Sequence, residues 1–368
     1  MPSPKRSPDS ETYLDWAELP VELLAAVAKR LASIHDYISF RGVCESWRSA
    51  ATFENFDREF PRFPWLMYVG GEEEGKEIGG VTKFLNMPEN KTYQIADFPP
   101  APGTYLSCSG WILCVSENMV DVNLTHPVWR IKIELPRLDT FPAFKLEDGV
   151  YPFISKMVLS GSPTTKTDLV VMVIWGEGNQ LGFSRPGDSS WTVMASWDDS
   201  FCDILYHNRR LYAVDVRRRV VECDIHGPNP GQILQVFSLP KDHGFSFSNK
   251  DLCYFVKSSG KFLIVSRHFN NCQTERFQIL EIDLMDGSHK EISKLGKKAL
   301  FLGFNTSFCL ERSASANVKP NSIYFTDHLW PCMLLDTGVY CLLDGRIKEF
   351  GGIPGPVHAP PVWVLPSF

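Results

Sequence analysis

Clusters of short apolar segments recur along most of the chain at a nearly constant interval. The clusters start at residues 105, 153, 201, 252 and 300, so successive starts lie 48, 48, 51 and 48 residues apart. The third cluster divides at turn residues into four strand-like segments, at 201–207, 209–214, 218–224 and 232–238. About four strands in a repeat of this length are typical of a β-propeller blade. One such sheet cannot bury both of its faces, so the pattern predicts a ring of stacked sheets.

The segments outside these five units predict how the ring closes. Strand-like segments remain near 64–69, 81–85 and 91–95, and Val362-Trp363-Val364 remains near the carboxyl end. If the last strand joins the first ones in a shared sheet, the ring has no open edge, and open edges favour aggregation. We therefore expect an all-β domain over residues 64–368 with about six blades. The alternatives are a long sandwich or two smaller β-domains.

The amino-terminal part of the chain has a different pattern, which predicts a three-helix module over residues 14–52. Leu19, Leu23, Val27 and Leu31 recur every four residues, as on one face of a helix, and Pro20 suits the first helical position. A segment this short rarely buries enough surface to be stable alone. Its apolar face should therefore contact either the following domain or another protein.

Two short segments flank the helical module. Residues 1–13 are polar and rich in proline, and we expect a disordered tail there. Residues 53–63 are rich in aromatic side chains and form a connector that we expect to attach the module to the β-domain.

The overall composition argues against several classes of protein. The net charge of −6 does not favour nucleic acid as the main partner, because phosphate binding needs a basic surface. No apolar run approaches the roughly 20 residues of a membrane span, and no secretory signal is present. The ten cysteines should then be reduced, in the cytoplasm or the nucleus or both, and their spacing predicts neither a disulfide framework nor a metal site.

Enzyme motifs are weak in this sequence. Residues 176–182, GEGNQLG, join two strand-like segments, so a hairpin turn explains them better than a dinucleotide site, which needs a following helix. Asp215, Asp224, Asp283 and Asp344 end strands in successive units. Two of them could converge as the carboxylate pair that glycoside hydrolysis needs, but aspartate commonly forms turns at the ends of strands. We predict no catalytic residue, no metal and no cofactor.

One basic run could bind a partner. Residues 209–219 read RRLYAVDVRRR, and Arg217, Arg218 and Arg219 are the candidates for contact with an acidic or phosphorylated partner. The simpler interpretation, a solvated hairpin, is favoured. Tryptophans such as Trp111 and Trp191 are expected in the core between blades.

The residues of the helical module resemble an F-box. The resemblance rests on Leu19-Pro20, Leu23-Leu24, Leu31, Asp36, Phe40, Val43-Cys44 and Trp47-Arg48, in this order and spacing. The blocks GWILCVSE, KMVLSGSP, LYAVD and DTGVYCLLDGRI are similar to plant F-box proteins with a carboxy-terminal KIB-type, kelch-like propeller domain. The resemblance implies an α+β multidomain chain, in which a small three-helix F-box precedes an all-β propeller.

The resemblance also implies a function. F-box proteins of this type serve as non-catalytic substrate-recognition subunits of SCF-type ubiquitin ligases, in which the F-box binds a Skp adaptor and through it a cullin. The propeller would hold a target protein, which the sequence does not identify. The adaptor-binding residues that the resemblance implies are Leu19, Pro20, Leu23, Leu24, Val27, Leu31, Val43, Cys44, Trp47 and Arg48. The alternatives are an F-box protein that acts outside a ligase and a propeller enzyme that acts on a small molecule or sugar.

Overall fold

The computed structural model divides the chain into two compact units, Met1–Pro61 together with Phe368, and Arg62–Ser367. The residues that the structure describes are 15–31, 34–52, 64–70, 81–87, 91–94, 105–116, 118–142, 144–145, 153–161, 169–194, 198–227, 229–239, 251–271, 273–311, 318–329, 334–349 and 361–365. The expected tail at 1–13 and the expected aromatic connector at 53–63 lie outside them. No helix among these residues has the length and apolar character needed to cross a membrane.

The first unit contains the expected helices. A 3-10 helix, η1 (Trp16–Glu18), precedes α1 (Val21–Ala28), α2 (Ile34–Gly42) and α3 (Glu45–Ala50). Pro20 is the residue before α1 rather than its first residue, and α2 ends at Gly42. The core of this unit consists of Leu24, Ala28, Tyr37, Phe40, Ala50 and Ala51, each at most 5% exposed.

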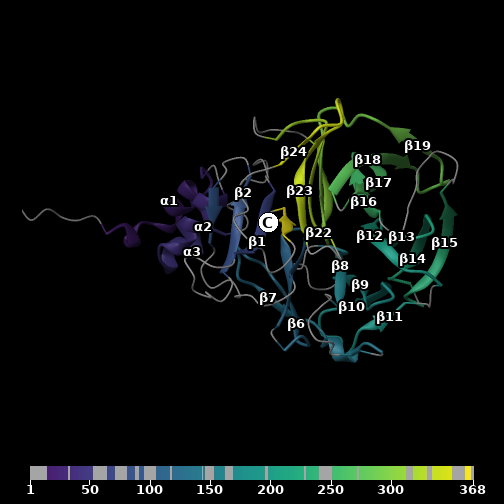
Figure 1. The fold of residues 1–368 in the computed structure, drawn as a ribbon. Coiled ribbons are helices and arrows are strands. Elements are labelled where there is room, and N and C mark those ends of the chain that lie inside the picture. Colours follow the sequence, from purple (N-terminus) through teal and green to yellow (C-terminus); the bar gives the residue numbers. More distant parts are fainter. Residues whose placement is uncertain are drawn as a thin grey trace, which may run out of the picture. The chain divides into compact units, whose positions relative to one another are not determined.

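The second unit is a six-bladed β-propeller, as predicted (Figure 1). Five sheets have four strands and one has five. In order around the ring, the first three sheets are β25 (Val362–Val364), β1 (Trp65–Gly70), β2 (Val81–Asn86) and β3 (Lys91–Tyr93); β4 (Tyr105–Cys108), β5 (Trp111–Val115), β6 (Val122–Thr125) and β7 (Lys132–Glu134); and β8 (Ile154–Leu159), β9 (Val171–Trp175), β10 (Gln180–Ser184) and β11 (Thr192–Val193).

The other three sheets follow the predicted repeat. They are β12 (Phe201–His207), β13 (Arg210–Asp215), β14 (Arg219–Asp224) and β15 (Gln232–Ser238); β16 (Leu252–Ser258), β17 (Lys261–Asn270), β18 (Gln273–Ile282) and β19 (His289–Ile292); and β21 (Ser307–Leu310), β20 (Ala299–Gly303), β22 (Ser322–Leu329), β23 (Leu334–Cys341) and β24 (Ile347–Lys348). The strands β4, β8, β12, β16 and β21 contact one another in turn at the centre of the ring.

The ring closes as the sequence predicted. The carboxy-terminal strand β25 pairs antiparallel with β1, and Leu66 lies opposite Trp363. Trp363 is fully buried, its indole Nε1 donates a hydrogen bond to the carbonyl of Leu302 at 3.0 Å, and its ring meets Phe301 edge-on. The strand therefore joins the first sheet of the ring to the last.

The last sheet departs from the expectation of four strands in chain order. Strand β20 pairs antiparallel with β21 and parallel with β22, so the chain crosses over before it continues outward. The turn between β20 and β21 reaches the first full unit, where the Asn305 side-chain amide and the Thr306 hydroxyl both donate to the carbonyl of Ser107. This hairpin adds a second contact that closes the ring.

Strands away from the outer edge, such as β5, β9 and β20, bury both faces, and this explains their continuous apolar runs. In β9, Val171 and Val173 pack into one core cluster, while Met172 and Ile174 pack into the next. Trp111 and Trp191 are buried in the first of these clusters, as expected for residues between blades.

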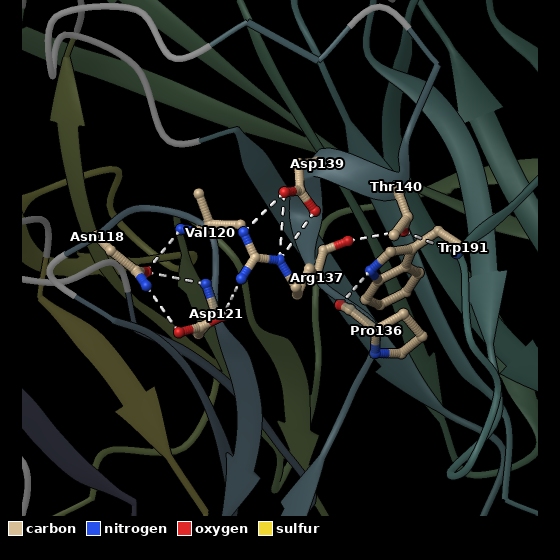
Figure 2. Close-up of polar contacts among 8 residues, drawn as sticks. All are labelled: Asn118, Val120, Asp121, Pro136, Arg137, Asp139, Thr140 and Trp191. Carbon is tan, nitrogen blue, oxygen red and sulfur yellow. Dashed lines mark hydrogen bonds and ion pairs between the residues drawn. The ribbon is translucent and has the colours of Figure 1, made fainter.

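Polar contacts add to this packing between the second and third sheets (Figure 2). Trp191 donates from Nε1 to the carbonyl of Pro136 at 2.8 Å and from its backbone to the Thr140 hydroxyl at 3.2 Å. Arg137 lies between Asp139, at 2.8 Å, and Asp121, at 3.4 Å. Its hydrogen bonds to Asp139 raise the pKa of Arg137 and lower the pKa of Asp139. These charges are exposed, so the pairs contribute little to stability, and they mainly order the segment between β7 and β8.

Candidate protein-binding surface of the helical module

The helical module is held together by hydrogen bonds from side chains to its own backbone. The Asp15 carboxylate accepts from the Ala17 amide and starts η1. From α3, the Trp47 indole donates to the carbonyl of Trp16 and the Ser46 hydroxyl donates to the carbonyl of Ala17, each at 2.9 Å. These bonds attach η1 to α3, although 29 to 31 residues separate the paired groups.

The second half of the module is fixed in the same way. The Tyr37 hydroxyl donates to the carbonyl of Thr52 at 2.6 Å, and the Arg41 guanidinium donates to the carbonyl of Ala51 at the end of α3. The Phe40 ring packs on the Trp47 ring, with 4.4 Å between their centroids. The carbonyl groups at the end of α3 therefore have side-chain partners, which helix ends require.

Helix α1 presents apolar side chains on two faces. Leu24 and Ala28, four residues apart, lie on the inner face and are each 1% exposed. Leu23 and Val27, also four residues apart, lie on the neighbouring face and are 55% and 46% exposed. A helix turns by 100° per residue, so one apolar face packs inside the module, where α1 contacts α3, while the other stays outside.

The module exposes more large apolar side chains than its size would suggest. Thirteen such side chains are exposed among the described residues, and five of them belong to this short segment: Trp16, Val21, Leu23, Val27 and Val43. Single exposed apolar residues are common on protein surfaces, but a concentration of them marks an interaction site. We take this set as the candidate protein-binding surface, and call it the apolar surface of the module.

The structure places the sequence-predicted adaptor-binding residues in three environments. Pro20, Leu23, Val27, Val43 and Arg48 are exposed, and Leu19, Leu31, Cys44 and Trp47 are half-buried. Leu24 is in the core, so it supports α1 from within and does not line the apolar surface. The Cys44 sulfur lies 3.0 Å from the Ser46 hydroxyl, and this hydrogen bond lowers the pKa of the thiol.

Sequence reasoning missed two exposed residues, and the adaptor contact of Trp47 stays a prediction. Trp16 and Val21 are 64% and 50% exposed but precede or begin the helical pattern, so the four-residue spacing did not include them. The sequence signal was present for Trp16, because Asp15 is a helix-capping residue and predicts a helical start there. Trp47 holds η1 and packs on Phe40, so a change at Trp47 disturbs the module itself.

The buried Tyr37 predicts an alkaline limit to the stability of the module. Burial raises the pKa of Tyr37 to about 12, although the nearby Arg41 charge lowers it. The pKa of Tyr37 is higher in the folded chain than its unfolded value of about 10. The neutral Tyr37 side chain therefore stabilises the folded module fully below pH ~10, and this stabilisation is lost as the pH rises through 12.

The helical circular dichroism signal at 222 nm should fall between these pH values and should change less steeply in Tyr37→Phe. Tyr212→Phe, in the propeller, is the control; equal alkaline profiles for the unmodified chain and Tyr37→Phe would contradict the prediction.

The basic run in the propeller is largely paired with carboxylates. Arg217 lies 2.9 Å from Asp199, and Arg219 contacts both Asp199 and Asp215. Side chains in such a network satisfy part of their hydrogen-bonding capacity within the chain. Contact of Arg217, Arg218 and Arg219 with a target stays a prediction.

The four strand-ending aspartates form turns, as the sequence predicted. Asp215 accepts from the amides of Arg217 and Arg219, and Asp224 accepts from those of His226 and Gly227. Asp283 and Asp344 each accept from the amide two residues later. Each carboxylate is thus occupied by its own turn.

The helical module and the six-bladed ring together define a class, the F-box proteins with a carboxy-terminal propeller, and comparison with known proteins agrees. Residues 84–341 match the model of the KIB1-4 beta-propeller family. The chain therefore belongs to the KIB1-4 β-propeller family.

Three relatives of the chain from the plant Arabidopsis thaliana are each named an F-box protein. Arabidopsis thaliana F-box protein At2g26160 is 24% identical over 86% of this chain and 96% of its own length. F-box protein SKIP23 from the same plant is 24% identical over 95% of this chain and 96% of its own length. F-box protein KIB2 is 24% identical over 84% of this chain and 71% of its own length. The similarity to two of the three spans nearly their whole length.

Proposed function

We propose that this chain is the substrate-recognition subunit of an SCF-type ubiquitin ligase in the cytoplasm or the nucleus. The observation that carries the proposal is the apolar surface of the module, in which Leu23 and Val27 extend from α1 without being needed in the core. A Skp adaptor would cover these side chains, and the propeller would bind the target.

The energetics of the apolar surface suit a stable partner. Complete burial of a leucine or valine side chain contributes about 1.5–3 kcal/mol, so burial of a few half-exposed residues can support a specific complex. Apolar residues at the centre of an interface usually supply most of its binding free energy. Arg48, in α3, is also exposed. Its positive charge would favour acidic residues at the rim of the partner's surface.

In this proposal the chain acts by proximity and makes no bond itself. Joining a target to the ligase converts ubiquitin transfer into a reaction within one complex, at high effective concentration of target lysines. The turn-forming roles of Asp215, Asp224, Asp283 and Asp344 support a binding role over sugar hydrolysis.

Affinity capture from plant cells with the proteasome inhibited tests this proposal. The unmodified chain should recover a Skp adaptor, a cullin and a set of target proteins. Leu23→Asp should recover the same targets without the adaptor and the cullin. If the unmodified chain recovers the adaptor but no cullin, the chain acts outside a ligase. If it recovers neither, the proposal is wrong.

A further inference from the structure

Three hairpin turns of the propeller have the same backbone geometry. Each joins a central strand to the next strand of its sheet: Ser109-Gly110 between β4 and β5, Asn208-Arg209 between β12 and β13, and Ser259-Gly260 between β16 and β17. In each turn both residues have positive φ angles. Such a turn normally has glycine at its second position, because a side chain is strained there. Arg209, at φ +62°, occupies that position in place of glycine.

The strain at Arg209 is kept although the turn does not need this side chain. A glycine would give the same backbone without the steric cost, as Gly110 and Gly260 do in the other two turns. Strained backbone positions in proteins cluster at functional sites. Arg209 is exposed, and the described part of the chain places no carboxylate within ion-pair distance of its guanidinium. Its charge is therefore available to another molecule.

A second cation without a carboxylate partner lies beside this turn. Lys257 is the last but one residue of β16, which contacts β12 at the centre of the ring (Figure 1). Its ammonium group is exposed and lies 3.1 Å from Nδ1 of His207, the last residue of β12. Among the described residues, Lys257 has no carboxylate within ion-pair distance either. By contrast Lys298, which donates to the Ser258 hydroxyl, lies 3.7 Å from Glu311.

The contact with Lys257 also determines how the His207 ring can bind. Burial, and next the charge of Lys257, lower the pKa of His207, so the imidazole is neutral at pH 7. An ammonium group only donates, so Nδ1 accepts its hydrogen bond and the ring proton lies on Nε2. The ring also meets Phe262 edge-on, with 5.0 Å between their centroids. Two cations and an N–H donor are thus close together, and all three suit an anion.

We propose that His207, Arg209 and Lys257 form a cationic site that binds an acidic segment of the target protein through its aspartate or glutamate side chains. Hydrogen bonds between charged donors and carboxylates are among the strongest in proteins, and complementary charge favours a specific partner. The site is distinct from the basic run after β13, in which Arg217 and Arg219 already contact carboxylates. The inference rests on the proposed function only in calling the bound protein a target.

Fluorescence anisotropy with a fluorescein-labelled peptide of ten glutamates tests the cationic site in the full chain. The unmodified chain should bind the peptide, and raising the salt concentration should weaken binding, because exposed charges are screened. Arg209→Gly and Lys257→Gln should each weaken binding roughly tenfold, as expected for the loss of one charged hydrogen bond. No binding with the unmodified chain at about 200 µM would overturn the proposal.

Adaptor binding is kept separate from this measurement. The peptide should bind Leu23→Asp as tightly as the unmodified chain, because the cationic site uses no residue of the helical module. A chain that recovers the adaptor but does not bind the peptide would refute the cationic site alone. A chain that binds the peptide but recovers no adaptor would refute the proposed ligase role and leave the site in place.

Two matched variants test whether position, rather than net charge, matters. Arg218 also has a positive φ angle, +66°, but lies in the turn at the other end of β13. Arg218→Gly therefore removes the same charge from a similar backbone and should leave peptide binding unchanged. Lys290→Gln is the control for Lys257→Gln, since Lys290 is paired with Glu281 at 3.1 Å. Weakening by the controls equal to that by the site variants would overturn the proposal.

The stability of Arg209→Gly tests the argument from strain. Glycine tolerates the left-handed conformation, so this variant should resist denaturant at least as well as the unmodified chain while binding the peptide more weakly. A clear loss of stability would show that the arginine serves the fold, and it would overturn the proposal.

A second peptide, with one phosphoserine among glycines and serines, tests the chemistry of the partner. The proposal predicts that it binds more weakly than the glutamate peptide. Tighter binding that also depends on Arg209 would assign the site to a phosphorylated protein and overturn the acidic segment.

Discussion

Leu23→Asp should abolish measurable binding of a Skp adaptor while the chain stays folded. The side chain is 55% exposed, so its replacement removes little from the core of the module. Aspartate near the start of α1 is also compatible with the helix dipole. In the complex, however, the variant loses an apolar contact and buries a charge. We expect affinity to fall at least ~100-fold, which corresponds to about 2.7 kcal/mol.

Surface plasmon resonance with the purified adaptor measures this loss of affinity. Two further variants serve as a control and as an independent repeat. Leu343→Asp, at a 72% exposed leucine in the turn between β23 and β24, has the same chemistry outside the module and should bind normally. Val27→Asp, one turn from Leu23 on the same face, should reproduce the loss. Unchanged affinity in both Leu23→Asp and Val27→Asp would show that the adaptor, if it binds, uses another surface.

Asp336→Ala should cause the largest loss of stability in the propeller. Its carboxylate accepts hydrogen bonds from Arg267 at 2.8 Å and from the backbone and hydroxyl of Thr274 at 2.9 and 2.6 Å. Arg267 is fully buried, with its guanidinium over the Phe325 ring at 4.4 Å. Without the carboxylate a buried cation loses the ion pair and the hydrogen bond that Asp336 supplies, so the free energy of unfolding should fall by about 3–5 kcal/mol.

Denaturant unfolding of the full chain measures this loss, and a double variant tests its cause. Arg267→Leu with Asp336→Leu removes both charges and should be more stable than Asp336→Ala alone, because the buried cation is removed together with its Asp336 ion-pair partner. Asp344→Ala, at an exposed turn of the same sheet, is the control and should cost about 1 kcal/mol or less. A small effect of Asp336→Ala, equal to that of Asp344→Ala, would contradict the prediction.

The strands could be predicted because their pattern is local and repeated. Each unit contains alternating apolar runs and turn residues, and strands β12 to β15 lie within one residue of the predicted segments. Closure by residues 362–364 followed from one physical requirement, the absence of open edges. These features depend on composition and periodicity, which a single sequence contains.

The features that the sequence did not predict depend on contacts between distant residues. Nothing local in the segment from Ala299 to Leu310 indicates that β21 would pair inside β20, because the deciding contacts are with Ser107, almost 200 residues away. Similarly, the adjacent Leu23 and Leu24 are both apolar. Only the packing of the module, in which α1 contacts α3, determines which of the two faces the core.

Transfer of ubiquitin in a reconstituted ligase tests the central claim most directly. The reaction would contain the adaptor, the cullin, the charged conjugating enzyme and a target captured by the propeller. The account predicts that the full chain promotes ubiquitination of that target. It also predicts that Leu23→Asp binds the target equally well without promoting transfer. Equal transfer with the two chains, or none with the full chain despite bound adaptor and target, would contradict it.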